Sequence, residues 1–157
     1  HLWLLGSNIL MEKNLKKEAE KRGINKSRLT FAKKLPLDKH LARHKLGDIF
    51  LDTFNYNAHT TASDALWTGM PLITFAGKSF SSRVSASLLK SIGLDELICS
   101  SKKEYYEKAL ELGRDREKLS CLRKKINENK FSYPLFNSSL FVKNYEFQLK
   151  QVISKHI

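Results

Sequence analysis

The stretch DIFLDTFNYNAHTTASDALWTGMPLITF, residues 48–75, decides the fold. Its apolar run at residues 49–51 suits a buried strand, and the polar loop that follows leads into a helix with Thr60 as its expected N-cap. Small and apolar side chains recur along one face of that helix, at Ala62, Ala65, Leu66 and Gly69, so the helix can pack closely against a sheet. A proline then ends the helix, and residues 72–75 form the next strand. The stretch therefore predicts a strand, a polar loop, a helix and a second strand.

Polar side chains gather where the first of these strands ends and the helix begins. Parallel α/β sheets bind phosphorylated ligands at this point, because the helix N-terminus presents unpaired N–H donors and about half a positive charge. The hydroxyls of Thr60 and Thr61 could donate to a diphosphate, and His59 could add a donor as negative charge develops on a leaving group. From spacing alone, this binding role and plain helix capping stay equally open.

Three aspartates accompany the same stretch. Asp64 lies one turn after Thr60, so its carboxylate is either favoured by the helix dipole or accepts hydrogen bonds from the hydroxyls of a ribose. Asp48 and Asp52 flank the first strand, but four residues of extended chain separate them by about 13 Å. That distance is too long for an acid/base pair, so capping or turn roles are expected for both.

The rest of the chain alternates between short apolar runs and helical patterns. Further strands are expected at residues 2–5, 29–32 and 97–99. Helices are expected at residues 11–22, 37–45, 81–91, 102–112, 114–129 and about 139–154. Such alternation predicts an α/β fold, a doubly wound parallel sheet with helices on both faces. We expect a single domain over residues 1–157, with the last helix packing at its end.

Composition narrows the class of protein. The formal net charge of +12, from 28 Lys+Arg against 16 Asp+Glu, would attract polyanions. However, the lysines are mixed with glutamates along helices and no nucleic-acid-binding motif accompanies them, so nucleic acid is not expected as a partner. No stretch approaches the roughly 20 apolar residues of a membrane span. Cys99 and Cys121 lack metal-site spacing and are expected to be buried free thiols in a reducing, cytoplasmic compartment.

Two long sequence runs resemble a known family. HTTASDALWTGMPLITFAG (residues 59–77) and SRVSASLL (residues 82–89) resemble the C-terminal catalytic lobe of the O-linked N-acetylglucosamine transferase and SPINDLY-like family, which are tetratricopeptide-repeat-associated protein glycosyltransferases. The resemblance extends from Leu2 through PLFN at residues 134–137 and is much more specific than a short glycine motif. It implies a Rossmann-like, nucleotide-sugar-binding lobe of a two-lobe GT-B enzyme. The chain, which opens inside a strand, would be a fragment of that longer protein.

The resemblance assigns roles to individual residues. The family residues that match His59, Thr60 and Thr61 bind the diphosphate of the donor, and the residue that matches Asp64 binds its ribose. His40 and Arg43, three residues apart on the helix expected at 37–45, match positions that flank the uridine. From the sequence alone, however, an ordinary basic surface is the better explanation of Arg43.

Three further positions qualify this assignment. Ser82 and Arg83 either help to hold the diphosphate loop or have a purely structural role. Leu37 departs from the family pattern, because many relatives have a lysine there that reaches the nucleotide. The departure affects the expected affinity for the donor.

The implied function is that of an inverting protein O-glycosyltransferase, in which this lobe binds UDP-N-acetylglucosamine and the sugar passes to Ser or Thr of a protein acceptor. His59 would be the catalytic group that stabilises the departing diphosphate. No metal or other cofactor is expected, since no Asp-x-Asp motif appears. The protein acceptor would bind through an N-terminal lobe and tetratricopeptide repeats outside the chain, so the fragment alone is expected to be inactive. A GDP-fucose-dependent protein O-fucosyltransferase lobe and a non-catalytic nucleotide-binding or protein-interaction module are the alternatives.

Overall fold

The computed structural model describes residues 1–155, in which the chain forms two compact units. The first unit covers residues 1–43, and the second begins at residue 44. All strand pairs within the two units are parallel, as the sequence predicts. Within residues 1–155, no helix combines the length and the apolar character needed to cross a membrane.

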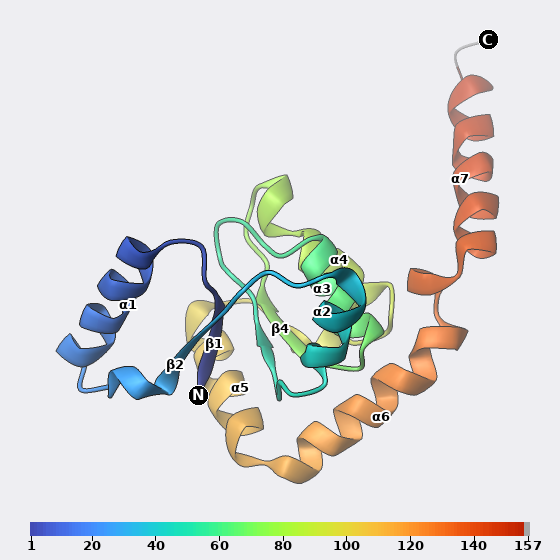
Figure 1. The fold of residues 1–157 in the computed structure, drawn as a ribbon. Helices are drawn as coiled ribbons and strands as arrows, with labels where there is room; N and C mark the ends of the chain where they lie inside the picture. Colours follow the sequence, from blue (N-terminus) through green and yellow to red (C-terminus); the bar gives the residue numbers. More distant parts are fainter. Residues whose placement is uncertain (156–157) are drawn as a thin grey trace. The chain divides into compact units, whose positions relative to one another are not determined.

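The first unit is a two-stranded parallel sheet with its connecting helix (Figure 1). Its elements are β1 (Leu2–Leu5), α1 (Ile9–Lys21), the 3₁₀ turn η1 (Lys26–Arg28), β2 (Leu29–Ala32) and most of α2 (Leu37–His44). The side chain of Asn8 caps α1 by accepting from the N–H of Met11, at 2.7 Å. The positive φ of Gly23, 73°, lets the chain turn after α1 toward β2.

The second unit is built on a three-stranded parallel sheet in the order β3-β4-β5. Its elements are β3 (Phe50–Leu51), α3 (Thr60–Trp67), β4 (Leu72–Phe75), η2 (Phe80–Ser82), α4 (Val84–Lys90), η3 (Asp95–Leu97), β5 (Ile98–Cys99), α5 (Lys102–Arg114), α6 (Arg116–Ser132), η4 (Pro134–Phe136) and α7 (Ser138–Ile153). The predicted central unit is therefore present as β3, α3 and β4. The predicted helix at residues 81–91 is divided into η2 and α4.

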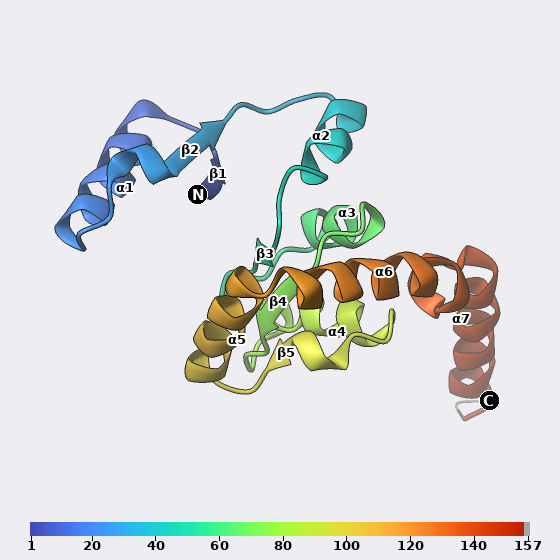
Figure 2. The same ribbon diagram turned by 90° about the horizontal axis from the view of Figure 1, so that it is seen from below.

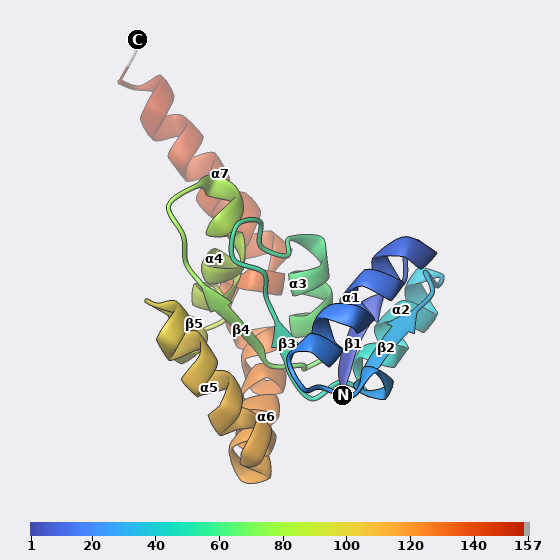
Figure 3. The same cartoon turned by 90° about the vertical axis from the view of Figure 1, so that its left-hand side faces the viewer.

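Helices cover both faces of this sheet. The strand β4 contacts α3, α4 and α5. Figure 3 shows β4 between α3 and α5. Because crossover connections between parallel strands are right-handed, α3 and α4 lie on the same face and α5 returns along the other. This arrangement fits a doubly wound sheet.

The core of the second unit lies where α3 meets β4. Ala62, Ala65 and Leu66, the predicted apolar face of α3, are fully buried. Leu72 and Ile73 of β4 are buried with them. Burial of each large side chain contributes about 1.5–3 kcal/mol, so the core fixes the position of α3 on the sheet.

Two further sequence expectations differ from the structure. Trp67 lies on a helix of small residues, so the sequence favours a core position for it. In the structure it is 46% exposed, with its ring edge-on to Phe136 at 5.2 Å and Lys130 above it at 5.3 Å. Trp67 follows the buried Leu66 by one residue, so its side chain points about 100° around the helix from that of Leu66, away from the buried face. Cys121 is exposed, whereas Cys99 is buried and free as expected, and burial raises the pKa of its thiol. In α7, the last helix in Figure 2, no residue of Ser138–Ile153 is buried, and the helix contacts η4. That this helix packs at the end of the lobe stays a prediction.

Candidate functional site

The start of α3 carries hydrogen-bond donors that the fold does not use. The N-cap of α3 is His59, with φ −105° and ψ −92°, and its side chain makes no capping hydrogen bond. The prediction that Thr60 caps this helix is therefore wrong, because Thr60 is the first helical residue. Neither the hydroxyls nor the backbone N–H groups of Thr60 and Thr61 make a hydrogen bond within residues 1–155, and both side chains are exposed. Helix capping consequently does not account for either threonine.

Aromatic contacts hold the ring of His59. The imidazole stacks on Tyr56, with ring centroids 4.9 Å apart and an interplanar angle of 13°. Phe80 meets the same ring edge-on at 6.2 Å. The Nε2 atom of His59 is buried and has no hydrogen-bond partner in the described part of the chain. A buried polar atom without a partner costs about 1–3 kcal/mol, and such atoms call for an explanation that a bound ligand would provide.

A buried carboxylate shapes the loop before His59. Asp52, at the end of β3, is 4% exposed. Its Oδ1 accepts from the N–H groups of Thr53, at 2.9 Å, and Ala58, at 2.7 Å. Its Oδ2 accepts from the hydroxyl of Thr74 on β4, at 2.7 Å. The expected turn role of Asp52 is thus confirmed.

The second loop of the site, residues 76–83, is held by its own hydrogen bonds. Ser82 is buried, and its Oγ accepts from the N–H of Ser79 at 3.1 Å. An added Cβ at Gly77 would lie 2.3 Å from the same Oγ, so only glycine fits there. Arg83 donates from Nη1 to the carbonyl of Gly77 at 2.9 Å. Both Ser82 and Arg83 therefore stabilise this loop in the structure.

The two loops are joined by hydrogen bonds. The N–H of Asn57 donates to the carbonyl of Ser81 at 2.8 Å, and the Ser81 hydroxyl donates to the carbonyl of Asn55 at 3.3 Å. The edge-on contact between the rings of His59 and Phe80 also connects the two loops. Ser82 and Arg83 thus support the loop before His59 indirectly, because they stabilise the loop of residues 76–83 that is hydrogen-bonded to it.

In the first unit, a contact with Arg43 selects the tautomer of His40. The Nη2 of Arg43 lies 2.9 Å from Nδ1 of His40, and its Nη1 donates to the carbonyl of Lys33 at 2.7 Å. A guanidinium can only donate, so Nδ1 of a neutral His40 is the acceptor and Nε2 carries the proton. Leu37, where many relatives have lysine, is exposed at the first residue of α2.

The predicted site residues thus form two groups. His59, Thr60, Thr61 and Asp64 come together at the start of α3 in the second unit. His40 and Arg43 come together on α2 in the first unit. That the two groups form one site stays a prediction. Sequence reasoning missed Tyr56 and Phe80, although an aromatic side chain within a polar loop was an available signal.

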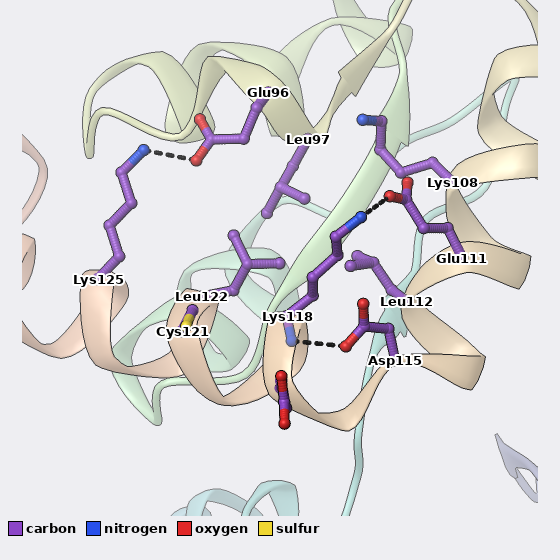
Figure 4. Close-up of a pocket in the computed structure, with 11 residues that line it drawn as sticks. Glu96, Leu97, Lys108, Glu111, Leu112, Asp115, Lys118, Cys121, Leu122 and Lys125 are labelled. Carbon is purple, nitrogen blue, oxygen red and sulfur yellow. Dashed lines mark hydrogen bonds and ion pairs between the residues drawn. The ribbon is translucent and has the colours of Figure 1, made fainter.

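A groove elsewhere in the second unit contains none of the predicted site residues. It has a volume of about 560 Å³ and lies between η3, α5 and α6 (Figure 4). Ion pairs join Lys125 to Glu96, at 2.5 Å, and Lys118 to Glu111 across it. Lys118 lowers the pKa of Glu111, and Glu111 raises that of Lys118. Four of the charged groups that line this open groove are thus paired with one another.

The geometry at the start of α3 defines a class of protein. Unused helix N-terminal donors, placed where a parallel strand ends, are typical of α/β domains that bind phosphorylated ligands. The model of glycosyl transferase family 41 matches residues 1–145. The chain therefore belongs to glycosyl transferase family 41.

Individual relatives agree with this membership. The chain is 34% identical over 155 residues to UDP-N-acetylglucosamine--peptide N-acetylglucosaminyltransferase of Caenorhabditis elegans, covering 99% of this chain and 14% of that protein. It is 35% identical over 146 residues to the probable enzyme SEC of Arabidopsis thaliana, covering 92% of this chain and 15% of that protein. An O-GlcNAc transferase mutant from Thermobaculum terrenum has a similar structure, with a TM-score of 0.85, 31% identity, and coverage of 92% of this chain and 28% of that one.

The comparisons confirm the predicted family and the predicted fold class, a Rossmann-like lobe of a GT-B glycosyltransferase. The chain spans about a seventh of the length of the curated relatives just named.

Proposed function

We propose that the chain is the donor-binding lobe of a protein O-glycosyltransferase that transfers N-acetylglucosamine from UDP-N-acetylglucosamine to Ser or Thr of protein acceptors. One observation in the structure carries the proposal. The hydroxyls and N–H groups of Thr60 and Thr61 make no internal hydrogen bond, beside a histidine whose buried Nε2 also has no partner within residues 1–155. These groups suit the diphosphate of a nucleotide sugar.

Each residue of the α3 group has a role in this proposal. The threonine hydroxyls and the helix N–H groups donate to the diphosphate oxygens, and the helix dipole adds a partial positive charge. Asp64 accepts hydrogen bonds from both ribose hydroxyls. The tautomer fixed by Arg43 gives His40 an Nε2–H donor for the uracil carbonyl side of the nucleotide.

The reaction is a direct displacement that inverts the anomeric carbon. The acceptor hydroxyl forms a bond to that carbon and gives its proton to a general base outside the chain. The bond to the diphosphate oxygen breaks at the same time, and its electrons pass to the diphosphate. His59 donates to the diphosphate as its charge grows, which stabilises the transition state more than the bound donor. Because Nε2 is buried, the surroundings of the imidazole must move locally to admit the ligand.

The proposal also covers the parts of the longer protein that lie outside this chain. The acceptor protein and the general base belong to parts of the longer protein, with tetratricopeptide repeats upstream and a cytoplasmic location. No metal is required, because His59, the helix terminus and a lysine supply positive charge to the leaving group. Within residues 1–155, no group of three or more His, Cys, Asp and Glu side chains is placed to hold a metal ion.

The remaining alternative is a non-catalytic binding module. The relatives named above carry UDP-N-acetylglucosamine in their names, which disfavours a GDP-fucose donor. The unused donors of Thr60 and Thr61 disfavour a module that has lost its ligand.

Calorimetric titration of the chain with UDP, GDP and buffer tests the proposal. UDP should bind weakly, because half of the donor pocket lies outside the chain, and its affinity should fall as salt screens the opposite charges. The sugar of UDP-N-acetylglucosamine should add little. Binding of GDP about tenfold more tightly than UDP, a difference of about 1.4 kcal/mol, would contradict the assigned donor. Absence of binding to any nucleotide would favour the non-catalytic module.

A further inference from the structure

Asp52 is a buried titratable group that the proposed reaction does not use. Burial of an ionised carboxylate is costly unless hydrogen bonds compensate it. Asp52 receives three such bonds, from the N–H groups of Thr53 and Ala58 and from the Thr74 hydroxyl. No Lys, Arg or His lies within ion-pair distance of it in residues 1–155, so neutral donors alone hold the charge. An apolar side chain could not accept these three hydrogen bonds, so the carboxylate of Asp52 has a specific structural role.

The hydrogen bonds of Asp52 connect segments that are distant in the sequence. The carboxylate connects the end of β3 to a backbone N–H six residues later, across the whole loop of residues 53–58. The Thr74 hydroxyl ties it to β4, and the Tyr105 hydroxyl of α5 donates to the Asp52 carbonyl at 2.9 Å. Burial raises the pKa of Tyr105, and the negative charge of Asp52 raises it further. Asp52 is thereby fixed to two strands and a helix.

The far end of this connection is the residue before His59. The N–H of Ala58 donates to Asp52, and the carbonyl of Ala58 accepts from the hydroxyl of Ser85 on α4, at 2.8 Å. Both polar groups of Ala58 are therefore held by buried side chains. Since His59 follows directly and is the N-cap of α3, these two hydrogen bonds determine where its imidazole lies relative to the helix N-terminus.

We propose that Asp52 is a positioning residue for His59 in sugar transfer, with Ser85 as its partner on the other side of Ala58. The proposal rests on the proposed role of His59 toward the donor diphosphate. Asp52 itself contacts neither substrate nor reacting atoms. Its contribution is to hold an imidazole where a shift of about 1 Å can cost about 10²-fold in rate.

The test uses the full-length transferase and a double-mutant cycle on kcat. Asp52→Asn removes the charge and leaves one acceptor oxygen, so it cannot accept from the loop N–H groups and from the Thr74 hydroxyl as the carboxylate does. Ser85→Ala removes only the hydrogen bond to Ala58. Each variant should lower kcat by about fivefold to tenfold while the donor KM changes less than about twofold, because position rather than affinity is lost. In a His59→Ala background, either change should lower kcat by less than about twofold, since residues that act through one group are not additive.

Asn129→Ala is the matched control. Its Nδ2 donates to the carbonyl of Ile92 at 2.7 Å, so the substitution also removes one partly buried hydrogen bond from side chain to backbone. Its melting temperature should fall at least as far as that of Ser85→Ala, with kcat unchanged.

The outcomes separate the two proposals. Asp52→Asn and Ser85→Ala with normal kcat and a lowered melting temperature would overturn the positioning role. So would losses of kcat that multiply with the loss caused by His59→Ala. In both cases the role of His59 would stand. If His59→Ala alone leaves kcat unchanged, the proposed function of His59 fails, and the positioning role fails with it.

Discussion

The imidazole of His59 lies face to face with the phenol ring of Tyr56, with centroids 4.9 Å apart. Tyr56 is 65% exposed, and Phe80 on the other loop, which meets the same imidazole edge-on, is 83% exposed. Two exposed aromatic side chains therefore flank the histidine that is proposed to act on the donor. Large apolar side chains at such exposure contribute little to the core. We therefore expect Tyr56 and Phe80 to act mainly through their contacts with the imidazole of His59.

Tyr56→Ala should release the imidazole of His59 without unfolding the protein. An aromatic pair contributes about 0.5–1.5 kcal/mol, and the substitution removes this hold on the ring. We expect kcat of the full-length transferase to fall by about threefold to tenfold, with a small change in melting temperature. Tyr56→Phe keeps the stacked ring and is the control, so kcat should stay near the original value. Equal losses of kcat in both variants would show that the hydroxyl, rather than the stack, matters.

Asp64→Asn should weaken donor binding more than turnover. An ionised acceptor is worth about 1.5–3 kcal/mol in a hydrogen bond, so the loss corresponds to about tenfold or more in Kd for UDP. Calorimetry on the chain measures the change. Asp48→Asn, at an exposed position before β3, is the control and should bind UDP normally. If both variants bind UDP as the original chain does, Asp64 has only the helix-dipole role.

Stability should fall at alkaline pH because of Tyr105. Burial raises the pKa of this phenol above its ordinary value of 10, and the charge of Asp52 adds to the shift. The folded protein keeps the proton where the unfolded chain loses it, so the stabilisation is complete below pH 10 and is lost as the pH rises through the folded pKa. Tyr105→Phe should remove this part of the alkaline decline. At neutral pH it should cost about 1 kcal/mol for the hydrogen bond to Asp52.

Tyrosinate absorbance measures the same group directly. The difference between the titrations of the original chain and of Tyr105→Phe should show one phenol that ionises above the others. A difference curve centred at the ordinary tyrosine value would contradict the buried environment of Tyr105.

The elements of the fold could be read from periodicity, because each leaves a local pattern. The strands at residues 2–5 and 29–32 lie where the apolar runs predict them. The buried face of α3 follows from small residues at helical spacing. Contacts distant in sequence leave no such pattern. The bond from Thr74 to Asp52 spans 22 residues, and the bond from Tyr105 to Asp52 spans 53.

The site residues were predictable only in part, for the same reason. His59 and the two threonines stand out as a polar group before a helix. The N-cap position, however, depends on backbone angles at His59 that the sequence does not encode in a simple pattern. Trp67 has a large apolar side chain of the kind found in cores, but its angular position on α3 leaves it exposed. Ser85 and Asp52 each have an ordinary capping or turn role in sequence, and their joint hold on Ala58 appears only in three dimensions.

The turnover of His59→Ala in the full-length transferase tests the central claim most directly. If His59 donates to a diphosphate whose charge grows as the sugar leaves, kcat should fall by about 10² or more, comparable with the loss of one oxyanion donor. The Kd for the donor should change modestly, and the melting temperature should hardly change, because the His59 side chain makes no capping hydrogen bond. Normal kcat combined with a large fall in melting temperature would contradict the account and make His59 a structural residue.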